Sequence, residues 1–217
     1  MHKPDHLVES DVREGLDWDP LLDDSRIVVK VKDGRVTLSG AVYTYPEIVR
    51  ASQDAGDVRG VIEVDNELLV GLAGGAVADV EVAEDCVDAL DADRFVPKGS
   101  VTPLVTDGWV TLGGQVRRHF QKVAAQYAVG KVDGVLGITN NLVIDSDPVP
   151  GDVADRINRA FRRNAILDDS QIDVSSNGHT IQLAGIVGSW YAKEEAEEAA
   201  WAAPGVTDVV DNLIIVR

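Results

Sequence analysis

One short residue pattern is written three times in this chain, and this repetition limits the possible folds more than any other feature. The three stretches read GRVTLSGAV, GWVTLGGQV and HTIQLAGIV, and each contains a glycine, at Gly40, Gly114 and Gly185. Apolar residues lie four and two positions before each glycine, and a valine lies two positions after it. Such alternation predicts a strand with one buried face. We therefore expect a tandem repeat.

The spacing beyond each glycine is also the same in all three copies. Twenty residues later comes a second glycine followed by valine, at Gly60, Gly134 and Gly205. Eight residues further on, a leucine lies in the closing stretch, which reads VDNELLV, ITNNLVI or VDNLIIV. Spacing that repeats in this way predicts three copies of one fold. The expected domains are residues 1–72, 73–147 and 148–217.

Turn signals divide each copy into its elements. Asp33-Gly34 and Asp107-Gly108 lie between alternating runs, which is typical of a β-hairpin, and Asn177-Gly178 carries one extra residue, so its turn should differ. Pro103 cannot donate a ladder hydrogen bond, so we expect an edge strand or a bulge there. The predicted fold is α+β, with three tandem α-β-β-α-β domains, each a three-stranded sheet packed with two helices.

Both predicted helices of each copy carry an apolar stripe. In the second helix the stripe consists of small residues, which allow close packing on a sheet. These stripes are Ala51, Ala55 and Val58; Ala125, Val129 and Val132; and Ala196, Ala200 and Ala203. The stripes of the first helices are Val8, Val12 and Leu16; Ala83, Cys86, Val87 and Leu90; and Val153, Ile157, Ala160 and Phe161.

The combined pattern resembles the BON domain. The resemblance rests on V-x-L-x-G-x-V, a short alanine-faced helix, Gly-Val and the closing V-x-N-x-L-x-V, and it covers nearly the whole chain. The stretches GWVTLGGQV and EEAEEAAWAAPGV of this chain resemble the second and third copies of osmotically inducible proteins with three BON domains. The resemblance implies binding to phospholipid surfaces and a role in stress or envelope maintenance, with no shared catalytic residues. The six glycines are interpreted as structural, with Gly40 ending its strand where a side chain would obstruct the neighbouring backbone.

Composition narrows the partners. The chain has 217 residues and a net charge of −17, which repels nucleic-acid phosphates and gives no overall attraction to an anionic bilayer. The N-terminal stretch lacks the apolar core of a secretory signal, and no apolar run is long enough to span a membrane. We therefore expect a cytoplasmic protein that binds no nucleic acid and has no transmembrane segment, although peripheral association with a membrane remains compatible with the sequence.

Signals for catalysis and for cofactors are absent from the sequence. The four histidines have no helical metal-ligand spacing, and no G-x-S-x-G elbow occurs. Cys86 is predicted to be a small buried hydrophobe. The paired aspartates Asp23-Asp24 and Asp168-Asp169 are predicted to cap backbone groups at turns. We expect a non-enzymatic protein without metal or cofactor.

Three groups of residues are candidates for binding. Arg156, Arg159 and Arg163 form a basic stripe beside the apolar face of their helix, which favours an anionic lipid or an acidic partner; the alternative is pairing with the protein's own carboxylates. The other candidates are a smaller basic cluster, Arg117, Arg118 and Lys122, and the aromatic residues Trp109 and Trp190. Trp109 should point outward or into the hairpin turn, because it falls between inward positions.

Two functional hypotheses remain open at this point. The first is association with a phospholipid surface through the arginine stripe of the third copy. The second is a scaffold that binds another protein, or a second copy of itself as a homo-oligomer, through exposed aromatic residues and sheet edges. Three similar modules in series favour multivalent attachment in either case.

Overall fold

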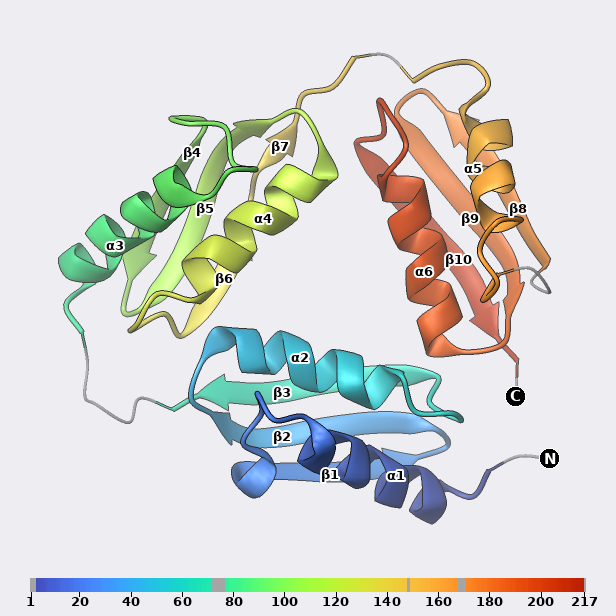
Figure 1. The fold of residues 1–217 in the computed structure, drawn as a ribbon, viewed down its shortest axis with the longest axis horizontal. Coiled ribbons are helices and arrows are strands. Elements are labelled where there is room, and N and C mark those ends of the chain that lie inside the picture. The colour runs from blue at the N-terminus through green and yellow to red at the C-terminus, as the bar shows by residue number, and fades with distance from the viewer. Residues whose placement is uncertain (1–2, 72–76, 148, 168–170, 217) are drawn as a thin grey trace. The chain divides into compact units, whose positions relative to one another are not determined.

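The computed structural model describes residues 3–71, 77–147, 149–167 and 171–216, and it places the same elements in the same order three times (Figure 1). The first copy contains α1 (Asp5–Trp18), η1 (Asp24–Arg26), β1 (Ile27–Lys32), β2 (Arg35–Val42), α2 (Tyr45–Gly56) and β3 (Glu63–Val70). The second contains α3 (Asp79–Ala92), β4 (Val101–Thr106), β5 (Trp109–Val116), α4 (His119–Gly130), β6 (Gly137–Asn140) and β7 (Val143–Ile144). The third contains α5 (Val153–Phe161), β8 (Gln171–Asn177), β9 (Thr180–Val187), α6 (Trp190–Trp201) and β10 (Asp208–Ile215).

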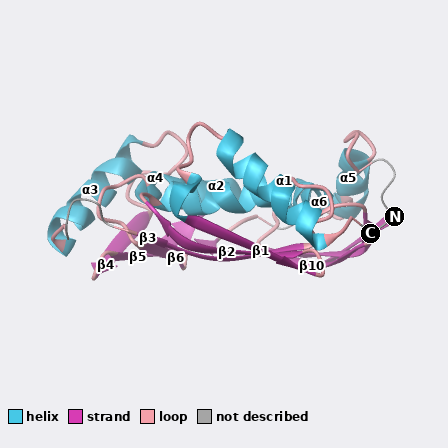
Figure 2. Ribbon diagram, turned by 90° about the horizontal axis from the view of Figure 1, so that it is seen from below, coloured by secondary structure: helices cyan, strands magenta, loops and turns pink. Residues whose placement is uncertain are grey.

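Each copy forms its own sheet with the hairpin's second strand in the middle. The strand orders are β1-β2-β3, β4-β5-β6 and β8-β9-β10. The hairpin strands pair antiparallel, and the closing strand pairs parallel to the middle strand. In each copy both helices cover one face of the sheet and leave the other face uncovered (Figure 2). The predicted α+β class with three tandem units is confirmed.

The closing strand of the second copy is interrupted. It is divided into β6 and β7, and both pieces pair with β5, so together they occupy one strand position. Pro103 lies in β4, which is an edge strand of this sheet, and it pairs with Leu112 of β5. The edge position predicted for this proline is therefore confirmed. On an edge strand, the nitrogen of a proline can face solvent, so the missing N–H costs no hydrogen bond to a neighbouring strand.

The cores follow the repeat closely. Leu38, Leu112 and Leu183 are completely buried, each in the middle strand of its sheet. In the predicted second-helix stripes, Ala51, Ala55, Ala125, Ala196 and Ala200 are also completely buried. The third position of each stripe is only half-buried, at Val58, Val132 and Ala203. The prediction for α3 was partly wrong, because Val87 is 46% exposed and Val82, which the predicted stripe omitted, is completely buried. The buried positions Val82, Cys86 and Leu90 repeat the spacing of Val8, Val12 and Leu16 in α1.

The first glycine of each copy is required by the backbone around it. Gly114 has φ +124°, and a Cβ atom there would lie 2.1 Å from the carbonyl oxygen of Ser100. The same obstruction occurs at Gly40 and Gly185, so the structural interpretation of these glycines is confirmed. One detail was wrong: the strand does not end at the glycine, since β2 continues to Val42. Glycine can adopt this positive φ because it has no side chain, and the strand therefore continues its pairing past this position.

The hairpin turns differ between the copies, as the sequence predicts. Asp33 and Gly34 both have positive φ, as do Asp107 and Gly108, which is typical of type I′ turns. In the third copy the turn lies at Gly178 and His179, and only the glycine has positive φ. The predicted extra residue was wrong, because Asn177 is the last residue of β8 and pairs with Thr180, which leaves a two-residue turn as in the other copies. Only the turn type differs.

The first helix holds the hairpin turn in two of the three copies. The carboxylate of Asp5 accepts hydrogen bonds from the backbone N–H groups of Asp33 and Gly34, at 2.7 and 3.1 Å. Asp79 accepts from the N–H groups of the second turn at 2.8 and 2.9 Å. Counting from the first buried valine, the third copy has Pro150 at this position. There, His179 instead donates from Nδ1 to the carbonyl of Gly205 at 2.8 Å.

The asparagine of the closing motif connects the last strand to the second helix. Asn66 donates from Nδ2 to the carbonyl of Ile48 and to Ser52 Oγ, both at 2.7 Å. Asn140 makes the equivalent bonds in the second copy. The third copy has Asp211 at this position, and an ion pair of 3.0 Å with Lys193 replaces the amide bonds.

The predicted capping by aspartates is confirmed where it can be followed. Asp23 accepts a hydrogen bond from the N–H of Ser25 at 3.1 Å and caps η1. Asp168 and Asp169 lie outside the described residues. No helix in the described ranges has the length and apolar character needed to cross a membrane.

Candidate anion-binding surface

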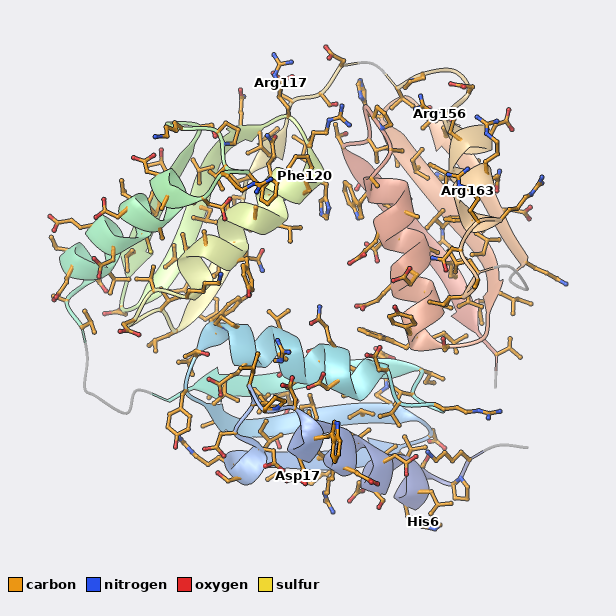
Figure 3. All side chains as sticks on the ribbon, in the orientation of Figure 1. His6, Asp17, Arg117, Phe120, Arg156 and Arg163 are labelled. Carbon is orange, nitrogen blue, oxygen red and sulfur yellow. The ribbon has the colours of Figure 1, made fainter. Side chains whose placement is uncertain are left out.

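The basic residues of the third copy lie on the outer side of its first helix. Val153, Ile157 and Phe161 face the core and are buried. Arg156 and Arg159 lie on the opposite side of α5 and are exposed, and Arg163 follows just after the helix ends (Figure 3). This separation of faces follows from helical periodicity, because Arg156 and Arg159 fall between the three core positions.

The three arginines line a common hollow between α5 and the end of α6, which we call the arginine hollow. Its volume is about 340 Å³. Its lining consists of the arginines and small or apolar residues: Arg156, Ile157, Arg159, Ala160, Arg163, Ala199, Ala202, Ala203 and Pro204. Among the residues that the structure describes, none of those in this lining is acidic. The small side chains of α6 leave the space that the guanidinium groups border.

The guanidinium groups of the arginine hollow are not neutralised by carboxylates of the described chain. Among the described residues, no carboxylate lies within 4.0 Å of a guanidinium nitrogen of Arg156, Arg159 or Arg163. Glu195, an acid of the neighbouring helix, accepts instead from the amide of Asn164 at 2.8 Å. The alternative of internal pairing therefore finds no support at these three arginines, and their donors can serve an external anion.

The charge of this surface is particular to the third copy. Arg156 and Arg159 occupy the positions that Asp11 and Glu14 occupy in α1, counting from the buried residues. The second copy also has two acids there, Asp85 and Asp88. Because the positions are exposed in all three copies, the change from acid to base leaves the fold intact and changes only what the surface attracts.

The second predicted basic cluster has a partly structural role. Arg117 and Arg118 are exposed in the loop between β5 and α4 (Figure 3). Lys122, in contrast, is half-buried and donates from Nζ to the carbonyl of Leu142 at 3.0 Å. This bond ties α4 to the closing strand, as the amide of Asn140 also does. Lys193 makes the same contact in the third copy, to the carbonyl of Leu213 at 3.1 Å, so the lysine shared by the two copies was a signal that sequence reasoning missed.

The predicted aromatic residues lie apart from the arginine hollow. Trp109 lies on the uncovered face of its sheet, is 50% exposed, and donates from its indole N–H to Thr139 Oγ1 at 2.8 Å. Its outward direction is therefore confirmed. Trp190 is the first residue of α6 and is half-buried. Neither residue lines the hollow, so the sequence candidates form separate surfaces.

The side chains that could act as a nucleophile or bind a metal do not form a reactive site within the described residues. Cys86 is completely buried, and burial raises the pKa of its thiol to about 11. A thiol with such a pKa is almost entirely protonated at neutral pH and is a poor nucleophile. In the part of the chain that the structure describes, histidine, cysteine and acidic side chains do not gather into a group of three that could hold a metal ion.

The chain is similar in sequence to a bacterial protein of known name. Osmotically-inducible protein Y of Escherichia coli (strain K12) is 34% identical over 121 residues, which is 54% of this chain and 60% of that protein. The chain therefore spans less than two thirds of this relative's length. Two structures of CdsD, a structural protein of the Type III secretion system of Chlamydia trachomatis, have TM-scores of 0.25 and identities of 11% and 12%. They cover 95% and 100% of this chain, and 91% and 100% of their own chains are covered in return. These two likenesses are too weak to bear on fold or function.

The family itself is established by a comparison with family models. The BON domain matches at residues 4–71, 78–146 and 151–217, so that each match contains one complete copy of the repeat. The family predicted from the glycine spacing is confirmed. The chain belongs to the BON-domain family, with three BON domains in tandem.

Proposed function

We propose that this protein is a non-enzymatic binding protein that attaches to anionic phospholipid surfaces through the arginine hollow of its third domain. One observation carries the proposal: three exposed guanidinium groups border one hollow, and none of them forms an ion pair within the described chain. Guanidinium groups bind phosphate oxygens with paired hydrogen bonds, which suits them to lipid headgroups.

The attraction has to be local, because the molecule as a whole opposes it. A net charge of −17 repels an anionic bilayer at long range. In physiological salt this repulsion is screened beyond about 8–10 Å. Within that distance each arginine contributes about 1 kcal/mol, so three contribute about 3 kcal/mol, or about a hundredfold in affinity if the terms add.

A role in stress or in envelope maintenance is the second part of the proposal. The relative from Escherichia coli is named for its induction by osmotic conditions, and it shares 34% identity over 121 residues. A protein that lies on a membrane surface without crossing it would suit such a role. Three domains in one chain would also let weak surface contacts add through their effective concentration. The proposed location is peripheral, on the cytoplasmic side that the sequence predicts.

Co-sedimentation with vesicles tests the lipid contact. We expect the full chain to bind vesicles of phosphatidylcholine and phosphatidylglycerol at low salt and to ignore vesicles of phosphatidylcholine alone. The triple variant R156E/R159E/R163E should lose this binding, while circular dichroism shows an unchanged fold. Its loss should equal or exceed a hundredfold, since reversal adds repulsion to the lost attraction.

A charge-matched control separates the local surface from the net charge. The variant K30E/K32E/K98E changes the net charge by the same amount, at three exposed lysines of the first and second domains. It should weaken binding much less than the arginine variant. Equal losses would mean that net charge alone governs the interaction. A wild type that ignores anionic vesicles at low salt contradicts the lipid proposal and favours the scaffold hypothesis.

A further inference from the structure

The uncovered sheet face of the second domain is free of ionisable side chains, although the chain is strongly charged. We call this surface the neutral face. Alternation along the strands places ten residues on it: Thr102, Leu104, Thr106, Trp109, Thr111, Gly113, Gln115, Gly137, Thr139 and Val143. The corresponding face of the first domain carries six charged residues: Lys30, Lys32, Arg35, Glu63, Asp65 and Glu67.

At the centre of this difference, an ion network has been replaced by an aromatic ring. In the first domain, Arg35 pairs with Glu63 at 2.6 Å and with Asp65 at 3.4 Å. In the second domain, Trp109 and Gly137 pair across the strands in the same way as Arg35 and Glu63 do in the first domain. They are therefore the counterparts of these two charged residues. Thr139 stands in the position of Asp65. The exchange of all three residues removes both signs of charge together.

Trp109 is fixed flat on the sheet. A Cβ atom at Gly137 would lie 2.4 to 2.6 Å from three carbons of the indole ring, so the ring packs directly over this glycine. The indole N–H donates to Thr139 Oγ1 at 2.8 Å, which holds the ring in its plane. Trp109 is nevertheless 50% exposed. One ring face thus lies on the backbone while the other faces solvent.

The size and charge of the neutral face select its occupant. A stable protein interface needs about 20–30 residues on each side, whereas the neutral face offers ten. Two copies of a chain with net charge −17 would also repel each other as they approached. A small, uncharged ligand meets neither obstacle. The face therefore fits a ligand of low charge and modest contact area better than it fits a second copy.

The side chains specify the chemistry of that ligand. A flat aromatic ring packs against the apolar C–H face of a sugar ring, and the partial negative charge of the ring face attracts those C–H groups. Thr106, Thr111 and Thr139 are neighbours of the tryptophan in the strand register, and Thr102 and Gln115 lie further along the same face. Neutral hydroxyls and amides hydrogen-bond sugar hydroxyls without a charge. We propose that the neutral face of the second domain binds a neutral, β-1,4-linked glycan, whose flat extended chain can lie along the strands.

Calorimetric titration of the full chain with cellohexaose and with chitohexaose tests the proposal. We expect at least one of the two to bind, and Trp109→Ala to weaken that binding at least tenfold. Thr139→Ala should weaken it less, because the ring keeps its place over Gly137 and loses only the hydrogen bond. The matched control is Trp18→Ala, which removes an 85% exposed tryptophan of the first domain and should leave binding unchanged.

Two results would overturn the proposal. One is the absence of binding to both oligosaccharides at millimolar concentration. The other is a shift in molecular mass by light scattering that Trp109→Ala abolishes, because it would identify a second copy as the occupant of the face. The arginine variant R156E/R159E/R163E should retain glycan binding, so this site and the lipid site can fail independently.

Discussion

The first helices of the first and third domains differ in one respect and agree in another. Their buried residues have the same spacing, with Val8, Val12 and Leu16 in α1 and Val153, Ile157 and Phe161 in α5. Their exposed residues carry opposite charges, since acids in α1 stand where α5 has Arg156 and Arg159. The fold thus fixes one side of the helix and leaves the other side to determine what each domain attracts.

The polar contacts behind this agreement are less uniform than the cores. Asp5 holds the hairpin turn of the first domain, but Pro150 stands at that place in the third. Asn66 connects the last strand and the second helix through amide bonds, whereas Asp211 and Lys193 use an ion pair. The BON domains of this chain therefore share one arrangement of buried apolar residues but use different hydrogen bonds and ion pairs around it. This is reasonable because the burial of apolar residues supplies most of the stabilisation.

The largest expected effect tests whether the apolar arrangement is shared. Leu112→Ala leaves a cavity at a completely buried position and should destabilise the second domain by about 2–5 kcal/mol. Leu38→Ala and Leu183→Ala should do the same in the first and third domains. Hydrogen exchange of each sheet's amides in the full chain measures the three effects separately. A change below about 0.5 kcal/mol, typical of a surface site, would contradict the shared core.

Much of this arrangement could be predicted from the sequence because apolar spacing and glycines express it directly. The obstruction at Gly114 and the edge position of Pro103 follow from elementary backbone rules. The face of α3 was assigned less well, because apolar residues lie on more than one side of that helix. Val80, for example, is 71% exposed. Aligning α3 with Val8, Val12 and Leu16 would have selected Val82 instead of Val87.

The polar contacts and the arginine hollow could not be predicted in the same way. The bonds of Asp5 join residues 28 and 29 positions apart, and no local pattern indicates them. An aspartate three residues before the first buried valine, in both of the first two copies, was the only available signal. The arginine stripe was visible as a pattern, but the hollow depends also on Ala199 of α6 and on Ala202, which follows directly after that helix. Only the packing of α5 and α6 brings them together.

A smaller effect tests the difference in turn support. Asp5→Ala removes the acceptor for two backbone N–H groups and should destabilise the first domain by about 1–2 kcal/mol. Asp79→Ala should have the same effect in the second domain. Pro150→Ala is the control in the third domain, where none of the described carboxylates bonds the turn, and it should leave the exchange of the β8–β9 amides unchanged. Equal losses in all three domains would show that the aspartates do not support the turns.

The smallest expected effect concerns a carboxyl that only the first domain possesses. Asp54 lies on α2 at the position where the other domains have Ala128 and Ala199. Its Oδ2 atom is buried without a hydrogen-bond partner among the described residues. Burial raises its pKa to about 6, and the neighbouring carboxylate of Asp19, which is paired with Arg50, adds to the increase. The ionised form of Asp54 is therefore disfavoured in the folded domain.

The pH dependence follows from the direction of this shift. Because the folded pKa is above the ordinary value of 3.8, the contribution of Asp54 to stability is fully present below pH 3.8 and is lost as the pH rises through about 6. The pKa of Asp19 is lowered, chiefly by a hydrogen bond from the backbone of Leu21, so its own contribution changes below pH 3.8, outside this window. Asp54→Asn should therefore stabilise the first domain at pH 7 and reduce its loss of stability between pH 4 and 6. Part of the loss should remain, because burial also raises the pKa of Asp57 above 3.8. Exchange of the β1–β3 amides, corrected for the intrinsic rate at each pH, measures this, with the β8–β10 amides as the internal reference. If the variant keeps the wild-type pH dependence, Asp54 does not cause that dependence. The first and third domains would then differ in surface charge, but Asp54 would not make pH affect their stabilities differently.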